Sequence, residues 1–343
     1  MKSELAKVHD GQLEIPYSTL PDSYPELVLN VYARLRQATP WAPEGFVVAR
    51  EQFVLQPNEF MLAFAGRETV AQSEGDKLVA ATVNGSVTFD KTGAICSWVV
   101  DGQERLLAPL EPYFWKPEND NQHAAHFAEQ SAVWQDAAQK RVVKSILAEG
   151  NQVFVDMSLP VGADLKIVYS LKSDGRIKVE MDYQPTAADL PLMPKFGMRM
   201  RLPADFTKIR YYGRGPWENY PDRKRSAFLG VYETTLQDYE TEYVHPQDNG
   251  NRCDIRWFEI GNGSERVLID GFQPLCIRAW DYGEEDLADV RHPNDIQRGR
   301  FVNLNIDLSV HGVGGADTWG KHTLPQYTVP GTSAHHYSFI LNP

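Results

Sequence analysis

The fold is decided by residues 165–183, which read LKIVYSLKSDGRIKVEMDY. Apolar and polar side chains alternate with a period of two on both sides of Asp174-Gly175. This period is typical of β-strands that bury one face. An Asp-Gly pair supplies the positive φ angles of a tight hairpin turn. We therefore expect two antiparallel strands joined at this turn, with the apolar positions facing a core.

Similar signals recur along the chain and favour a mainly β protein. The 25 glycines and 22 prolines are spread evenly along the chain. Turn residues at such regular intervals are typical of chains made of many short strands. Further strands are expected in a hairpin over 86–100, in a closing strand over 334–341, and near the start over 26–36 and 46–55.

One segment has a helical pattern instead. Residues 124–140 are rich in Ala and Gln, and Phe127, Ser131, Trp134 and Ala138 recur at helical spacing. This spacing places the four side chains on one face of a helix. The sequence therefore predicts a helix here.

The chain divides near a polar stretch without a period, residues 67–77. We expect a first piece over 1–60, a linker over 61–77 and a large β domain over 78–343. The first piece holds two or three expected strands, fewer than the roughly seven of an immunoglobulin-type sandwich. It is therefore interpreted as part of a domain.

Composition excludes several classes of protein. Lys and Arg total 34 against 46 Asp and Glu, a formal net charge of −12, which disfavours a nucleic-acid binder. No apolar run is long enough for a membrane helix, and the first residues lack a signal-peptide pattern. The three cysteines, Cys96, Cys253 and Cys276, are too scattered for a zinc site or disulfide framework. No nucleophile elbow, metalloprotease motif or nucleotide fingerprint is present.

Three segments are dense in aromatic, amide and carboxylate side chains. They read PYFWKPENDN over 112–121, YYGRGPWENYPDR over 211–223 (followed by YVHPQDNGNR over 243–252) and HGVGGADTW over 311–319. Aromatic faces stack on the apolar face of a pyranose, while carboxylates, amides, Arg and His bond its hydroxyls. These segments therefore indicate contact with sugars.

In this order and spacing the segments resemble the C-terminal region of β-galactosidases of glycoside hydrolase family 2. That region is the last domain of the large enzymes and the small subunit of the two-chain ones. The resemblance covers about residue 78 to the end, with a weaker match over 11–60. It implies a large antiparallel β-supersandwich of galactose-mutarotase-like shape, preceded by part of an immunoglobulin-like β-sandwich.

The resemblance also implies an activity that this chain is expected to lack by itself. The family hydrolyses terminal β-D-galactosides by the retaining route, with two carboxyl groups about 5 Å apart. Both are glutamates of a preceding (β/α)8 barrel, which needs about 250 residues. The single Asn-Glu pair, Asn58-Glu59, lies outside the family's acid/base motif and is interpreted as a surface site. We expect a chain that is inactive alone and completes the pocket and the subunit contacts of a barrel-bearing partner.

The family's sugar-contacting positions map onto two segments. The tryptophan of the Gly-Gly-x-Asp-x-Trp string is Trp319, which the resemblance expects to stack on the bound sugar beside Asp317; the alternative is a core tryptophan in a turn. The stretch holding Asn119, Asp120 and Asn121 matches a loop near the family's active site. Its alternative is an Asx turn that caps the next helix.

The remaining expectations concern metals and architecture. The family uses Mg and Na, mainly in the barrel, so we expect no cofactor and no catalytic or metal-binding residue in this chain; His245 and Pro246 match positions that offer carbonyls to sodium. The stretch 215–223 is interpreted as architectural, with a pair between Glu218 and Arg223. We expect a homo-oligomer in the full enzyme, no nucleic-acid or membrane partner, and a compartment, cytoplasmic or periplasmic, that the chain leaves open.

A second hypothesis is a free-standing carbohydrate-binding or aldose-1-epimerase-like β-sandwich. Epimerases of this shape use a His and a Glu as an acid/base pair. Here His311 or His245, with a nearby glutamate, would take that role.

Overall fold

The computed structural model describes residues 8–9, 12–13, 25–288, 290–317 and 320–343. It divides the chain into two compact units, Met1–Glu59 and Phe60–Pro343. None of the helices in these described ranges is long and apolar enough to cross a membrane.

The first unit contains two small antiparallel sheets in its described residues. They pair β1 (Val8–His9) with β2 (Gln12–Leu13), and β3 (Leu27–Arg34) with β4 (Val47–Gln56). The strands expected over 26–36 and 46–55 are therefore confirmed. The second hairpin leaves large apolar side chains in solvent, with Trp41 66% exposed and Phe53 50% exposed. It therefore buries little apolar surface within this chain.

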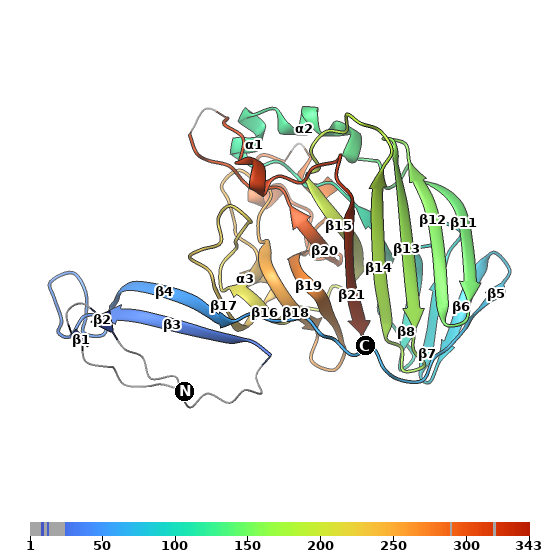
Figure 1. Ribbon diagram of the computed structural model, residues 1–343, viewed down its shortest axis with the longest axis horizontal. Coiled ribbons are helices and arrows are strands. Elements are labelled where there is room, and N and C mark those ends of the chain that lie inside the picture. Colours follow the sequence, from blue (N-terminus) through green and yellow to red (C-terminus); the bar gives the residue numbers. More distant parts are fainter. Residues whose placement is uncertain (1–7, 10–11, 14–24, 289, 318–319) are drawn as a thin grey trace. The chain divides into compact units, whose positions relative to one another are not determined.

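The second unit is one hydrogen-bonded network of 17 strands, all paired antiparallel among the described residues. Its first layer holds, in spatial order, β17 (Phe228–Thr235), β16 (Lys208–Gly215), β18 (Arg252–Gly261), β19 (Arg266–Trp280), β21 (His335–Asn342), β14 (Ile177–Pro185), β13 (Ala163–Leu171), β12 (Gln152–Leu159) and β11 (Val142–Glu149). Figure 1 shows β11 to β14 and β21 side by side.

The second layer starts from the same long strand, β19. Its residues Leu268–Gly271 pair with β21, while Cys276–Trp280 pair with β20. From there the layer holds β20 (Val302–Val310), β15 (Lys195–Leu202), β10 (Ala108–Tyr113), β8 (Ile95–Val100), β7 (Gly85–Phe89), β6 (Lys77–Thr82) and β5 (Ala71–Glu74), with the short β9 (Gln103–Glu104) beside β8. One strand thus belongs to both layers.

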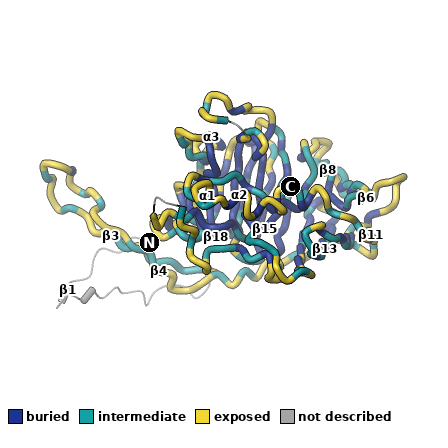
Figure 2. The backbone as a smooth tube through the Cα atoms, turned by 90° about the horizontal axis from the view of Figure 1, so that it is seen from above, coloured by how far each residue is buried: buried dark blue, intermediate teal, exposed yellow. Residues whose placement is uncertain are grey.

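Aromatic side chains join the layers across the core. The rings of Phe89 in β7 and Tyr169 in β13 have centroids 5.0 Å apart. Phe196 in β15 meets Tyr183 in β14 at 5.8 Å and Tyr337 in β21 at 5.9 Å. Figure 2 shows the strands of this unit as its buried part, with exposed residues mostly in loops. The expected large antiparallel β-sandwich is confirmed.

The hairpin of residues 165–183 is confirmed with one change at its turn. The apolar side chains at the alternating positions from Leu165 to Tyr183 are all at most 1% exposed, and Leu171 pairs with Ile177. The turn is longer than the two residues expected, because the Lys172 N–H donates to the Arg176 carbonyl and only Gly175 has a positive φ, of 87°. The hairpin over 86–100 and the closing strand, β21, are also confirmed.

The expected linker over 61–77 is partly wrong, because it contains β5 and further paired backbone. The Ser173 N–H donates to the Arg67 carbonyl, and the Thr69 N–H to the Leu171 carbonyl. The physical reason is that strand pairing uses backbone groups, which polar residues carry equally well. The absence of an apolar period therefore did not exclude a strand.

The helix expected over 124–140 is wrong as one element. The chain instead forms α1 (Asp120–Ala124), α2 (Phe127–Gln130) and a 3-10 turn, η1 (Ala132–Trp134). His126 adopts the left-handed conformation, with φ of 55°, and this separates α1 from α2. The apolar face itself is right, since Phe127, Ser131, Trp134 and Ala138 are all buried.

Short helical segments and loops complete the unit. They are α3 (Leu236–Tyr239) and the 3-10 turns η2 (Glu284–Leu287), η3 (Pro293–Asp295) and η4 (Pro325–Tyr327).

Candidate functional site

The three polar segments meet in space, although they lie about 100 residues apart in sequence. The Gln122 side chain donates to the Gly312 carbonyl at 3.1 Å. The carboxylate of Asp222 accepts from the backbone N–H groups of Val313 at 3.0 Å and Gly314 at 2.8 Å. The loop after β20 is therefore held from one side by the first segment and from the other by the second.

The side chains of Asn119 and Asn121 hold that loop by hydrogen bonds. Asn119 is the N-cap of α1, because its side-chain oxygen accepts from the Gln122 N–H at 2.9 Å. The amide nitrogens of Asn119 and Asn121 each donate to the Val313 carbonyl at 3.2 Å. The capping alternative is thus confirmed for Asn119, which is only 7% exposed.

Asp120 lies in solvent beside the second segment. Its carboxylate accepts from the Gln247 side chain at 3.1 Å and lies 3.4 Å from Nδ1 of His245. The His245 carbonyl, expected at a sodium position, accepts from the Gln247 amide at 3.2 Å. Asp120 therefore retains an accessible carboxylate.

Asp317 lies in the exposed part of the loop, where its carboxylate accepts from the Lys321 N–H at 3.1 Å. Trp319 lies outside the described residues, so its expected position is not tested. Gly314 and Gly315 adopt positive φ angles of 74° and 92°. This conformation favours glycine and explains the Gly-Gly of the motif.

The stretch 215–223 packs as the architectural interpretation expects. Glu218 and Arg223 form an ion pair at 2.5 Å, and the other Glu218 oxygen accepts from the Gly250 N–H at 2.9 Å. Tyr220 is 1% exposed in a small apolar cluster. Trp217 differs from that expectation, since 43% of it remains exposed.

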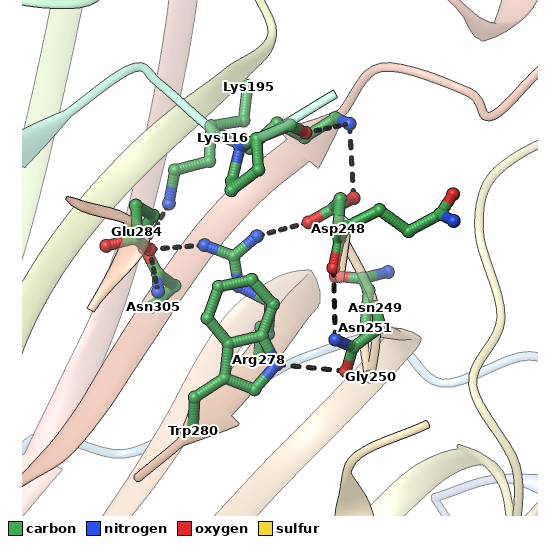
Figure 3. Close-up of polar contacts among 12 residues, drawn as sticks. Lys116, Lys195, Asp248, Asn249, Gly250, Asn251, Arg278, Trp280, Glu284 and Asn305 are labelled. Atoms are coloured by element: carbon green, nitrogen blue, oxygen red, sulfur yellow. Dashed lines mark hydrogen bonds and ion pairs between the residues drawn. The ribbon is translucent and has the colours of Figure 1, made fainter. Parts of the chain in front are cut away.

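A buried chain of charges lies behind these segments. The guanidinium of Arg278 donates to the carboxylates of Asp248 and Glu284, as Figure 3 shows. Lys116 of the first segment forms an ion pair with Asp248 at 3.1 Å. Arg199 forms one with Glu284 at 3.1 Å.

The chain of charges continues along β15 and β20. Lys195 donates to the carboxylate of Asp307 at 2.9 Å and also contacts Asn305. Asn303 and Asn305 each donate to Glu284 at 2.9 Å. Because single buried charges are costly, this mutual pairing is what allows the cluster to be buried.

Burial and neighbouring charges shift the titration of this cluster. Burial raises the pKa of Asp307 to about 6 against the attraction of Lys195, and burial lowers the pKa of Lys195 to about 8. Burial alone would raise the pKa of Glu284, but Arg278 and Arg199 outweigh it and hold that pKa at about 2. Glu284 is therefore an anion throughout the neutral range.

The sequence motifs do not reveal this cluster, although the pattern of β20 carries a signal for it. Residues 302–310 read VNLNIDLSV, in which polar Asn303, Asn305 and Asp307 alternate with apolar residues. That period places all three on one face of β20. The same period also fits a strand whose polar face meets water, and only the structure shows that Asn303, Asn305 and Asp307 are buried.

The structure gives little support to an epimerase-type His and Glu pair. His311 is 2% exposed, its ring lies 4.3 Å from that of Phe127, and burial lowers its pKa to about 3. Within the described ranges, neither His311 nor His245 is hydrogen-bonded to a glutamate. In the same ranges, no group of three or more His, Cys, Asp and Glu side chains is arranged to hold a metal ion.

Comparison with known proteins agrees with these motifs. The family described as "Beta galactosidase small chain" matches residues 82–341, and "Beta-galactosidase, domain 4" matches residues 6–56. A β-galactosidase of Priestia megaterium is 32% identical over 93% of this chain and 32% of its own length. Those of Lactobacillus delbrueckii subsp. bulgaricus and Vibrio cholerae are each 29% identical, over 97% and 92% of this chain and 33% and 32% of their own lengths.

Among solved structures, a GalM/aldose epimerase homologue from C. elegans covers 80% of this chain and 98% of its own, with 6% identity and a TM-score of 0.42. The chain spans about a third of the length of the curated relatives it matches. The family match covers most of the second unit, including all three polar segments. The chain therefore belongs to the β-galactosidase small-chain family.

Proposed function

We propose that this chain is the non-catalytic C-terminal portion, or small subunit, of a β-galactosidase. Its role is to complete the galactoside pocket and the subunit contacts of a barrel-bearing catalytic part. The observation that carries this proposal is the family match over residues 82–341, together with relatives three times as long that are named β-galactosidases. The match of residues 6–56 to domain 4 supports a first unit that is one part of a larger domain.

Two carboxylates of the second segment, Glu218 and Asp222, are engaged in structural contacts. A retaining glycosidase needs one carboxylate free to attack and one carboxyl group free to transfer a proton. Glu218 is occupied by Arg223 and by the Gly250 N–H. Asp222 accepts three hydrogen bonds, including one from Thr323. Neither carboxylate is therefore free for these roles. In the proposal the nucleophile, the acid/base, Mg and Na belong to the catalytic part, as the family resemblance implies.

The loop over 312–323 is the surface this chain offers to the sugar. Its base is fixed by the Asp222 carboxylate and by the amides of Asn119 and Asn121. In the proposed complex, Trp319 stacks its indole on the apolar face of the galactoside. Asp317 and Asp120, both exposed, accept hydrogen bonds from hydroxyl groups at the rim.

Reconstitution tests this proposal. The chain alone is expected to show no hydrolysis of a chromogenic β-galactoside, and mixing it with a barrel-bearing chain that lacks this region is expected to restore activity. Trp319→Ala should raise KM in the mixture, whereas Trp217→Ala, at an exposed tryptophan of the second segment, serves as the matched control. Hydrolysis by the chain alone, or association without any change in activity, would contradict the proposal.

A further inference from the structure

A second concave surface lies on the other side of the first polar segment. It is a cleft of about 1000 Å³ whose walls come from β10, β15, the segment around η1 and the segment around η2. Trp115 and Glu118 line it, whereas Asn119, Asn121 and the 312–323 loop do not. The first segment therefore faces the loop with one part and this cleft with another.

The charged floor of the cleft is already paired within the protein. Arg199 lies 3.4 Å from Glu111 and 3.1 Å from Glu284, and its guanidinium lies 3.9 Å from the centre of the Tyr113 ring. Arg201 pairs with Glu285. These groups form a polar floor in which each charge has a partner of opposite sign.

The pairing of the lining charges limits the ligand. The lining residues include five carboxylates and two guanidinium groups, and Glu284, Glu111 and Asp136 also pair with cations just outside the lining. The cleft therefore offers no unpaired cation to an anionic ligand such as a phosphate or a sugar acid. A neutral ligand does not need one.

Two amides and one indole on the walls are free to meet a ligand. Gln135 and Gln139 are exposed and line the cleft four residues apart. In the described part of the chain, neither side-chain amide has a hydrogen-bond partner. Trp115 packs partly on the core, while the rest of it lines the cleft.

We propose that this cleft binds a neutral saccharide. Each glutamine amide can donate to one sugar hydroxyl and accept from another, and the indole of Trp115 can cover the apolar face of a pyranose. The volume is at the upper end of the range for small-molecule sites, which suits a disaccharide better than a single sugar. The paired carboxylates and guanidiniums of the floor add fixed acceptors and donors.

The full 343-residue chain can be titrated with lactose, galactose and galacturonate by calorimetry and by saturation-transfer NMR. We expect saturable binding of lactose with a Kd on the order of 1 mM, weaker binding of galactose, and none of galacturonate. The double variant Gln135→Ala/Gln139→Ala should weaken lactose binding about tenfold or more. It should fold normally, since both amides lack partners. Trp115→Ala should abolish binding.

Two controls separate this cleft from the proposed function. Gln237→Ala changes an exposed glutamine elsewhere and should leave lactose binding intact. Trp319→Ala should lower reconstituted galactosidase activity and leave lactose binding to the chain unchanged. The double glutamine variant should weaken lactose binding and leave the reconstituted activity unchanged. Three results would each overturn the proposal: no saturable binding of lactose, binding of galacturonate as tight as that of lactose, or an unchanged Kd for lactose in the double glutamine variant.

Discussion

Asp222→Ala is expected to loosen the loop over 312–323 while the sandwich stays folded. The Asp222 carboxylate accepts from the N–H groups of Val313 and Gly314 and from the Thr323 hydroxyl, at 3.0, 2.8 and 2.7 Å. These three donors come from both ends of the loop. A single side chain therefore closes its base.

The free energy that Asp222→Ala removes from the closed loop follows from these three hydrogen bonds. A hydrogen bond to a charged group contributes about 1.5–3 kcal/mol when buried. Asp222 is half-buried and the freed donors can bind water, so about 1 kcal/mol per bond is the better figure. The sum of about 3 kcal/mol corresponds to a roughly 100-fold larger population of the open loop. Asp222→Asn keeps one acceptor oxygen and should lose about half as much.

Hydrogen–deuterium exchange measures this effect directly. The peptide covering residues 312–317 should exchange roughly 100-fold faster in Asp222→Ala, while peptides from β13 and β14 should be unchanged. Gly312→Ala should give a similar result independently, since an added Cβ would lie 2.6 Å from the Asp222 carboxylate. Asp76→Ala, at an exposed turn, is the control.

One result would refute the reasoning. If loop exchange is unchanged in both Asp222→Ala and Gly312→Ala, then the carboxylate does not hold the loop. Faster exchange throughout the sandwich would also contradict it, because the role would then be one of general stability.

Three further predictions concern the core and the buried charges. Ile167→Ala, at a fully buried position of β13, should lower the free energy of unfolding by about 3 kcal/mol, measured by urea denaturation. Arg278→Met leaves the carboxylates of Asp248 and Glu284 without their shared cation, so it should cost about 3–5 kcal/mol in the same assay; a loss below about 1 kcal/mol would argue against this pairing. The pKa of Glu284 is about 2 in the folded chain against 4.5 ordinarily, so its ionisation stabilises the fold above pH 4.5 and that contribution, about 3 kcal/mol, is lost as the pH falls toward 2. Glu284→Gln should be less stable at pH 7 and lose less stability over that acid range, and an acid limb as steep as in the unchanged chain would contradict the assignment.

Local pattern predicted the strands well, because burial of one face imposes a period of two that side chains must follow. The alternating residues from Leu165 to Tyr183 needed no tertiary information to be placed in the core. The same period in β20 places the polar residues Asn303, Asn305 and Asp307 on one face. The period does not specify which residues pair with that face.

The side-chain pattern was a less reliable guide to the bounds of an element where backbone conformation sets them. The face containing Phe127 and Trp134 is buried as expected, but the left-handed His126 divides the helix. Residues 67–69 pair with the β13–β14 turn through backbone hydrogen bonds, beside one ion pair between Lys172 and Glu68. Backbone donors and acceptors are the same for every non-proline residue. No side-chain period reports them.

The sequence by itself determined the mainly β class, most of the strands, and the family through three motifs. Only the tertiary structure decided that those motifs meet, that Asp222 closes the loop from both ends, and that Lys116, Asp248, Arg278 and Glu284 share one buried cluster. The physical reason is that alternation along a strand specifies which face a side chain occupies. The neighbours of that face are set by the order in which strands pair, and this order brings together residues separated by up to 194 positions.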